Sequence, residues 1–443
     1  MQKPKADKPT LQQKLEKRKF KTPSAFVTGL YNAIGSTVLL PKYAPHFSSE
    51  VDINDREGAA FLVWNHLSRL DHLYTMKLVY PGKYNMVAGY SEFFRSHLHT
   101  VFRLNRILPK KIFTQDRLGI KAMNQIIKQG GIVAFSPEGM SSIYGCSQPV
   151  VAGTGHFLRH YGIPVYCVRM RGQYLTSTKH YLEERKGRTE AHLFLLFTKE
   201  QLKEMTDEQV EDALNEEFRH DEFEWTKQHG ITWQMHGHSC EHLDEICYRC
   251  PRCGSELSMH AEGSDISCTV CGNGAMMDDK YEFIPFNGGC VILESPSKWV
   301  LEERGHVIKQ IREDPDFSFS EHVTLGCLPE DRYVKNMQTS VPCGEGTFTV
   351  DHTGVSFEGV RDGQPYSFKL NYSSVYTLVI MTSTAKFALY VNNRFLEFTP
   401  DRRSVGKLLL LVEEMHRYHV NAWRNFKWYD YLYDGLELGI DVK

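Results

Sequence analysis

Short apolar runs separated by helix-like stretches constrain the first half of this chain. The runs cover residues 59–64, 84–88, 132–135 and 163–168, and stretches such as 72–80 and 117–129 between them suit helices. Strands that alternate with helices predict an α/β domain, a mixed sheet with flanking helices. Loops at strand exits carry function in such sheets. The polar residues directly after each run are therefore the first candidates for a site.

The first run leads into Asn-His-Leu-Ser-Arg-Leu-Asp at 65–71. If Asp71 begins a helix, its carboxylate can hold one imidazole nitrogen of His66 while the other faces a substrate. That pair is the base and its orienting partner from a catalytic triad, with a substrate hydroxyl as the nucleophile. The competing interpretation is a helix start, with Ser68 as the cap and Asp71 as its capping-box partner. The heptapeptide alone favours this second interpretation.

A second candidate loop follows the run at 132–135. Pro137 fixes a turn, and Gly139 lets the backbone approach a ligand closely. Glu138 then lies beside His66 if the two strands are neighbours. Cations at a strand exit and a helix start suit phosphate binding, although a solvated charged face explains them equally. These cations are Lys110, Lys111 and Arg117.

In this order, the residues resemble the motifs of the glycerolipid acyltransferases, the PlsC-like 1-acylglycerol-3-phosphate acyltransferase family. His66 and Asp71 resemble its HxxxxD motif, residues 135–139 its F-x-P-E-G motif, and residues 162–164 its G-[VI]-P motif. The resemblance covers roughly residues 20–225 and rests on the ordered set, not on any one motif.

The resemblance implies roles for these residues. His66 is the expected general base and Asp71 its orienting partner. The acceptor site is expected to take Pro137, Glu138 and Gly139, and the acyl-donor side Pro164. Lys110 or Lys111 stands where a phosphate-contacting residue is expected. The family often has Thr-Arg after F-x-P-E-G, whereas this chain has Met-Ser at 140–141, so Lys110, Lys111 or Arg117 would have to substitute.

The implied reaction moves a fatty acyl group from acyl-CoA or acyl carrier protein to the hydroxyl of a lysophospholipid. The favoured acceptor is 1-acyl-sn-glycerol 3-phosphate. A thiol is a good leaving group, so no covalent enzyme intermediate is needed, and the chain has no G-x-S-x-G motif. Two alternatives stay open. The missing Arg favours a different hydroxyl acceptor, and a non-catalytic scaffold that docks membranes or partners is the rival from another class.

Two C-x-x-C-G motifs predict a small zinc ribbon after a linker, within residues 229–282. The motifs contribute Cys250 and Cys253, then Cys268 and Cys271, and this spacing is typical of zinc ligands. Four thiolates leave no open coordination position, so the expected zinc is structural. Cys247 is a competing ligand that we rank as a spare. The cluster suggests reduced thiols and a metal rather than disulfides.

Charge and hydropathy predict where the protein acts. The formal net charge of −2 argues against a nucleic-acid partner, and no apolar run reaches 18 residues. Residues 1–24 form a basic segment that precedes an apolar stretch. Such a pair can lie on an anionic membrane surface, or be a solvated tail followed by a packed helix. The expected location is cytoplasmic, at the inner face of the membrane.

The remaining domains follow from composition. Residues 25–228 form the acyltransferase-like domain and 283–345 a mixed connecting region with a helix over 296–312. Strand signals dominate 346–400, with turns at 351–354 and 392–393, and a helix follows at 402–420. This element order predicts a β-rich, PH/GRAM-like domain over 346–425, closed by a helix. An aromatic and acidic tail at 426–443 is a candidate interface segment.

Overall fold

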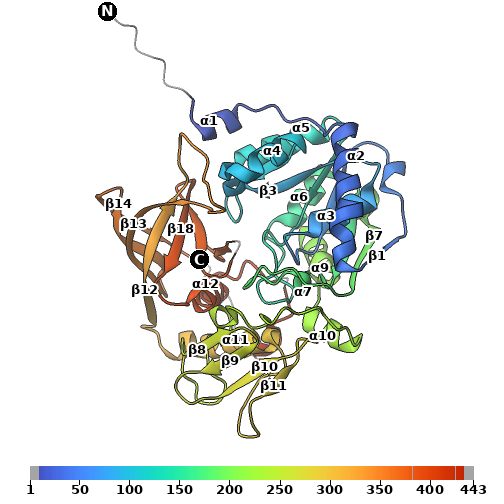
Figure 1. Cartoon of the computed structure of the whole chain (residues 1–443). Helices are drawn as coiled ribbons and strands as arrows, with labels where there is room; N and C mark the ends of the chain where they lie inside the picture. The colour runs from blue at the N-terminus through green and yellow to red at the C-terminus, as the bar shows by residue number, and fades with distance from the viewer. Residues whose placement is uncertain (1–8, 382, 425, 434–443) are drawn as a thin grey trace, which may run out of the picture.

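The chain folds into three parts that follow one another in sequence, each built on its own sheet. The computed structural model describes residues 9–381, 383–424 and 426–433. In Figure 1 the first part lies at the upper right, the second at the bottom and the third at the left.

The first sheet is mixed, with the strand order β1-β7-β6-β2-β5-β3-β4. Its central strand β2 is buried at every residue and pairs in parallel with β5 and β6, while β6 and β7 are antiparallel. The predicted mixed α/β sheet is therefore present. Its strands are β1 Pro45–Ser49, β2 Ala60–Trp64, β3 Tyr84–Gly89, β4 Leu108–Lys110, β5 Ile132–Phe135, β6 Val165–Arg171 and β7 Thr189–Phe197.

Helices cover this sheet (Figure 1). The two predicted at 72–80 and 117–129 are α3 and α5; α3 is displaced by one residue at each end, and α5 begins as predicted and ends two residues earlier. The helices are α1 Leu11–Glu16, α2 Ala25–Ile34, α3 Asp71–Val79, α4 Ser96–Leu104, α5 Arg117–Ile127, α6 Thr154–Tyr161, α7 Gln173–Thr176, α8 Lys199–Glu204, α9 Asp207–Glu217 and α10 Glu222–Gln228.

The described part of the N-terminal segment lies on the domain. Leu15 of α1 and Phe20 are buried, and the Phe20 N–H donates to the Gln125 side chain at 2.8 Å. By contrast, α2 buries none of its residues and continues into the π-helical turn Gly35–Leu39. Within the described residues, no helix is both long enough and apolar enough to cross a bilayer. Lys3, Lys5 and Lys8 lie outside the described residues.

The second part holds the two cysteine motifs on a small antiparallel sheet with the order β11-β10-β9-β8. The helix expected at 296–312 follows it as α11, Pro296–Glu313, with Ser295 as its N-cap. The strands are β8 Met259–Glu262, β9 Asp265–Cys268, β10 Gly274–Met277 and β11 Phe283–Pro285.

The third part is an antiparallel sheet with the order β15-β14-β13-β12-β18-β17-β16, followed by α12, Val405–His419. It differs from the predicted boundary at residue 346, because β12 and the start of β13 come from the supposed connecting region. The pairing of β12 with β18 joins residues more than 60 positions apart, which no local pattern reveals. The strands are β12 Ser318–Cys327, β13 Val341–Asp351, β14 Gly354–Arg361, β15 Gln364–Leu370, β16 Val379–Ile380, β17 Phe387–Val391 and β18 Arg394–Pro400.

The hairpin turns are at the expected places. The turn at 351–354 joins β13 to β14, and Asn392 and Asn393 join β17 to β18 with left-handed backbones. The β12–β13 pairing also brings Cys327 and Cys343 together as a disulfide, with Cα atoms 6.0 Å apart. The expectation of reduced thiols does not hold for this pair, which the strand pairing juxtaposes.

The three parts are joined by buried polar contacts. The Lys111 ammonium donates to the Asn393 side chain at 2.6 Å and to its carbonyl at 3.0 Å. The tail folds back inward, and the Tyr429 hydroxyl lies 2.7 Å from that of Tyr144. Trp423, Phe426, Tyr429 and Tyr433 are buried, so most of this aromatic stretch packs inside the molecule, while Tyr431 is 62% exposed. Residues 434–443 of the predicted tail lie outside the described residues.

Candidate active site

His66 and Asp71 form the pair that the sequence predicted. His66 lies two residues beyond β2, and Asp71 is the first residue of α3. The His66 Nδ1 and the Asp71 Oδ2 are 2.8 Å apart. The carboxylate also accepts from the Leu67 N–H at 2.9 Å and the Ser68 N–H at 3.0 Å. Asp71 thus orients the imidazole. The interpretation of Ser68 as the cap in a capping box is wrong, because α3 begins at Asp71, its N-cap is Leu70 and no side chain caps it.

The charge on Asp71 is buried beneath the histidine. Burial raises the pKa of Asp71, while the His66 ring and the two backbone N–H groups lower it. In the described structure, Nε2 of His66 has no hydrogen-bond partner, and the side chain is 27% exposed. An oriented imidazole with one free nitrogen is suited to take a proton from a bound group.

Glu138 ties the loop after β5 to the loop after β2. One of its oxygens accepts from the His66 N–H and the other from the Gln148 N–H, the latter at 3.2 Å. The Ser142 N–H returns to the His66 carbonyl at 2.7 Å. Burial raises the pKa of Glu138 to about 8, against the two N–H groups that lower it. Glu138 therefore positions the His66 backbone, and the expectation that it contacts the acceptor is not what the geometry shows.

Asn65 fixes the same loop from the other side. Its side-chain N–H donates to the Met170 carbonyl at 2.9 Å, and its oxygen accepts from the Met170 N–H at 2.8 Å. This reciprocal pair joins the end of β2 to β6. The loop that carries His66 is thus attached to both neighbouring strands.

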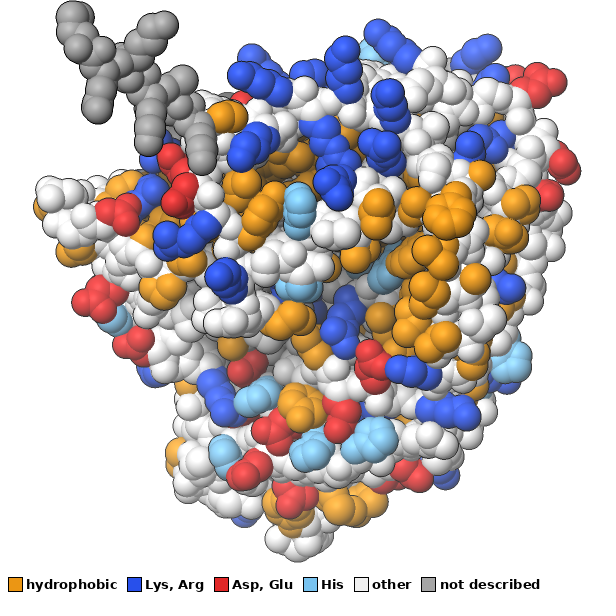
Figure 2. Space-filling view, turned by 45° about the horizontal axis from the view of Figure 1, so that its top comes forward, with side chains coloured by type: hydrophobic (Ala, Val, Ile, Leu, Met, Phe, Trp, Pro, Cys, Tyr) orange, Lys and Arg blue, Asp and Glu red, His pale blue; other side chains and the backbone are white. Residues whose placement is uncertain are grey.

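His66 opens onto a cavity of about 1040 Å³. Figure 2 shows this face hollowed, with hydrophobic, histidine and basic side chains in the hollow. Much of the wall is apolar and lies between the sheet and α4 to α6; it includes Trp64, Met86, Phe102, Ile107, Phe113, Met123, Phe135 and Phe157. A cavity of this size and lining suits an apolar chain with one polar end.

The other residues expected at the site are only partly brought together. Pro137 and Gly139 line the cavity. Gly139 has φ +80°, and a Cβ there would lie 2.7 Å from the Phe113 ring, so only glycine fits. Pro164 lies at the opposite end of β2 from His66, where its carbonyl accepts from the Phe61 N–H at 2.9 Å.

The predicted phosphate-binding cations have separate positions. Lys110 lines the cavity, but its ammonium donates to the carbonyls of Lys111 and Thr114 at 2.6 and 3.3 Å. Lys111 is buried and bonded to Asn393 in the β-rich part, which makes it a structural residue. Arg117 lines a separate surface groove. The expectation that Lys111 or Arg117 contacts a phosphate in this cavity therefore does not fit the geometry.

Sequence reasoning missed the cavity residues that come from distant segments. Ser177 and Lys179 follow α7, and residues 336–339 and 379–381 come from the β-rich part. No motif marks these positions, because their approach depends on how the three parts pack.

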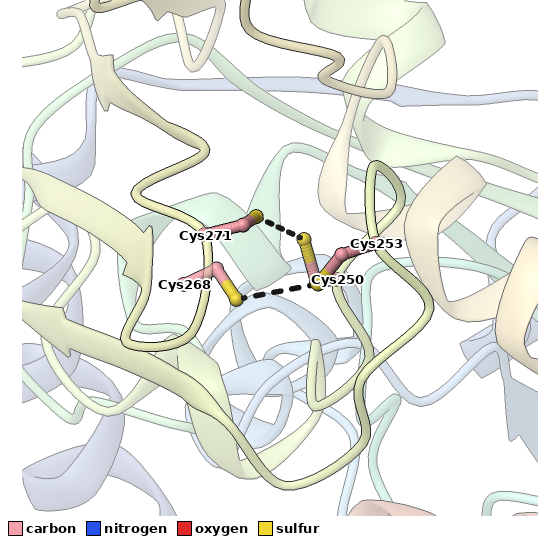
Figure 3. Close-up of side chains that lie close together, drawn as sticks. All are labelled: Cys250, Cys253, Cys268 and Cys271. Atoms are coloured by element: carbon pink, nitrogen blue, oxygen red, sulfur yellow. Dashed lines mark hydrogen bonds between the residues drawn. The ribbon is translucent and has the colours of Figure 1, made fainter.

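The cysteine motifs form a second candidate site (Figure 3). The sulfur atoms of Cys250, Cys253, Cys268 and Cys271 all lie within 4.8 Å of one another, with distances of 3.7 Å for Cys250–Cys271 and 3.8 Å for Cys253–Cys268. Four thiolates around zinc at Zn–S bonds of about 2.3 Å place their sulfurs roughly 3.8 Å apart. The four residues therefore fit a zinc ion. Cys247 is outside the group, with its thiol 4.0 Å from the Pro296 carbonyl.

Comparison with solved structures gives a likeness of fold for part of the chain. No protein family and no curated protein matches the chain by sequence. The crystal structure of the 1-acyl-sn-glycerophosphate (LPA) acyltransferase PlsC from Thermotoga maritima is similar to part of this chain, at 16% sequence identity and a TM-score of 0.38. The match covers 44% of this chain and 77% of that one. So loose a likeness carries no argument about activity, which is inferred below from the site itself.

The two backbone hydrogen bonds that Glu138 accepts predict that a neutral amide at this position lowers the stability of the fold. In Glu138→Gln the amide can accept from only one of the two backbone N–H groups and turns its own NH₂ toward the other. We expect urea denaturation at pH 9, where Glu138 with its pKa of about 8 is mostly ionised, to show a loss of about 1–3 kcal/mol, the cost of an unpaired buried donor. The control is Glu184→Gln, where the carboxylate is 40% exposed and its ion pairs lie at the surface. Equal stability of the two variants would show that the hydrogen bonds to Glu138 do not stabilise the fold.

The cysteine cluster predicts a bound zinc that stabilises the fold. Cys253→Ser should reduce the zinc content and lower the melting temperature, since a structural zinc contributes folding free energy on the order of 10–16 kcal/mol in small domains. Cys290→Ser is the control, because Cys290 lies outside the cluster. Metal analysis and thermal melts with and without a chelator test this. Full-length protein that melts identically after chelation would show that no metal supports the ribbon.

Proposed function

We propose that this chain is an O-acyltransferase that moves an acyl group from an acyl thioester to a lysophospholipid hydroxyl. The observation that carries the proposal is the His66–Asp71 pair, 2.8 Å apart, at the mouth of a large, mainly apolar cavity. The favoured acceptor is 1-acyl-sn-glycerol 3-phosphate, and the donor is acyl-CoA or acyl carrier protein.

The chemistry needs no nucleophile from the protein. His66 Nε2 takes the proton of the acceptor hydroxyl as the hydroxyl oxygen attacks the thioester carbonyl. The new C–O bond forms, the C–S bond breaks, and the proton passes from His66 to the departing thiolate. Asp71 stabilises the imidazolium that forms between these steps.

The exposed face of α2 supports a peripheral position on a membrane. Phe26, Leu30, Ile34 and Val38 recur every four residues, and all are exposed, Phe26 at 79% and Val38 at 57%. Hydrophobic side chains gather over α2 at the right of Figure 2, and Lys and Arg side chains gather across the top. Residues Pro23, Thr28 and Tyr31 also line the cavity. An apolar helix face beside cations suits an anionic bilayer, and here it adjoins the cavity.

The β-rich part is proposed to be PH/GRAM-like. The order of its elements supports this assignment. Strands β12–β15 come first, strands β16–β18 follow and pair back onto β12 through β18, and helix α12 closes the domain. In this chain its loops also line the cavity, so its role is taken up below.

The proposed reaction predicts the effect of removing the base. His66→Ala should lower acyl transfer from a long-chain acyl thioester to 1-acylglycerol 3-phosphate by about 10²–10⁴-fold, the range for a lost general base. Thioester consumption and product analysis measure this. His156→Ala, at an exposed histidine of α6, is the control. Equal activity of wild type and His66→Ala would remove His66 from the mechanism.

The α2 face predicts membrane binding that depends on its apolar side chains. Leu30→Glu/Ile34→Glu should lower co-sedimentation with phosphatidylcholine–phosphatidylglycerol vesicles by about tenfold or more, because each buried apolar side chain is worth roughly 1.5–3 kcal/mol. Val291→Glu, at an exposed valine beyond the ribbon, is the control. Unchanged sedimentation of the double variant would exclude α2 as the docking face.

A further inference from the structure

Lys179 is a cation in the cavity with an unusual set of neighbours. Its ammonium donates to the Ser141 hydroxyl at 2.9 Å. No carboxylate of the described residues lies within ion-pair distance of it. Burial lowers the pKa of Lys179 to about 8, and Glu92 opposes that shift from farther away. A buried ammonium whose contact is a neutral hydroxyl has capacity left for an anion.

The other cations that line the cavity are already occupied. Arg69 pairs with Glu184 at 3.5 Å, and Arg95 pairs with Glu92 at 2.8 Å. Lys386 lies 3.4 Å from Glu397. Lys110 donates to two carbonyls. Among the cavity-lining residues of the described structure, Lys179 is thus the cation best able to accept a new negative partner.

Ser177 supplies a second polar group from the same segment. It lines the cavity and is 4% exposed, and its hydroxyl has no hydrogen-bond partner in the described structure. A buried hydroxyl without a partner costs free energy unless a ligand or water satisfies it. Ser177, Lys179 and Ser141 all line the cavity, and together they offer two hydroxyls and an ammonium, the donor set that a phosphate takes.

These residues are connected to the catalytic loop. Ser141 precedes Ser142, whose N–H donates to the His66 carbonyl at 2.7 Å. The segment that carries Lys179 is held by hydrogen bonds to Tyr281. The Tyr281 hydroxyl donates to the Leu175 carbonyl at 2.8 Å, and the Arg185 guanidinium donates to the Tyr281 hydroxyl at 3.0 Å. The donors are thus held at a defined position relative to His66.

We propose that Lys179, Ser177 and Ser141 bind the phosphate of the hydroxyl acceptor and so select a phosphate-bearing lysolipid over its uncharged analogue. The proposal rests on the proposed acyl transfer for the identity of the acceptor. Residues 336–339 and 379–381 of the β-rich part line the same cavity, where the Arg95 guanidinium holds the Met337 carbonyl at 3.0 Å. The acceptor site is therefore closed by two parts of the chain.

Binding of three probes to the full-length protein tests this without turnover. The probes are 1-acylglycerol 3-phosphate, 1-acylglycerol and inorganic phosphate, followed by calorimetry or by fluorescence of Trp64 in the cavity wall. Lys179→Met should weaken binding of the phosphate-bearing lipid by roughly 10- to 150-fold, the range for a hydrogen bond to a charged group, and Lys179→Arg should restore most of it. Ser177→Ala should weaken it by about 2- to 10-fold. Binding of 1-acylglycerol should not change.

The controls separate this proposal from the proposed reaction. Lys42→Met, at an exposed lysine, should bind like wild type. His66→Ala should bind the phosphate-bearing lipid normally while it loses transfer. If His66→Ala keeps full activity but Lys179→Met still loses lipid binding, the reaction fails and the subsite stands. Equal binding by wild type and Lys179→Met, or no preference of wild type for the phosphate, would overturn the subsite. Inorganic phosphate bound as tightly as the lipid would assign the site to a free anion instead.

Discussion

The buried carboxylate of Glu138 joins the exits of β2 and β5, and the geometry of the site depends on that join. Its two oxygens accept backbone N–H groups from His66 and Gln148, so neither loop can shift alone. Asn65 makes a matching connection from β2 to β6. The imidazole therefore stands on backbone fixed from both sides before Asp71 orients its ring. In the proposed reaction the acceptor oxygen has to meet both the imidazole and the thioester carbonyl, so this fixed placement would contribute to the rate.

Local spacing was enough to predict the groups whose partners are near in sequence. His66 and Asp71 are five residues apart, and each C-x-x-C pair sits on one turn, so a loop or a helix start suffices to bring them together. The strands β2, β3, β5 and β6 were predictable for the same reason, since each is a short apolar run, whereas β1, with the sequence Pro-His-Phe-Ser-Ser, carries no such signal. The roles of the cations were not predictable, because they depend on which distant segment of the chain approaches each cation. Lys111 resembled a phosphate ligand in sequence, yet its ammonium donates a hydrogen bond to Asn393, 282 residues away.

The second part of the chain, which holds the four-cysteine cluster, contacts the cavity wall. Tyr281 lies just beyond β10 and donates to the Leu175 carbonyl in α7, beneath the segment of Ser177 and Lys179. Arg185 bonds both Tyr281 and the carbonyl of His238, so the same segment is attached to the linker before the ribbon. If the proposed zinc is bound, its loss would loosen these supports without touching His66. The four-cysteine part is thereby linked to the wall of the proposed acceptor site.

The β-rich part lies at the end of the chain, yet it contributes residues to the cavity of the candidate site. Its loop at 334–337 hydrogen-bonds to the backbone of residues 94–96, and its turn at 392–393 takes up Lys111. Chain neighbours of both contacts, Arg95 and Ile112, line the cavity that contains His66. A chain ending after the first sheet would keep His66, Asp71 and Glu138 but leave one wall of the cavity open to water. Because electrostatic interactions weaken as water enters, such a chain would retain the His66–Asp71 pair and lose much of the environment that the proposed phosphate site at Lys179 requires.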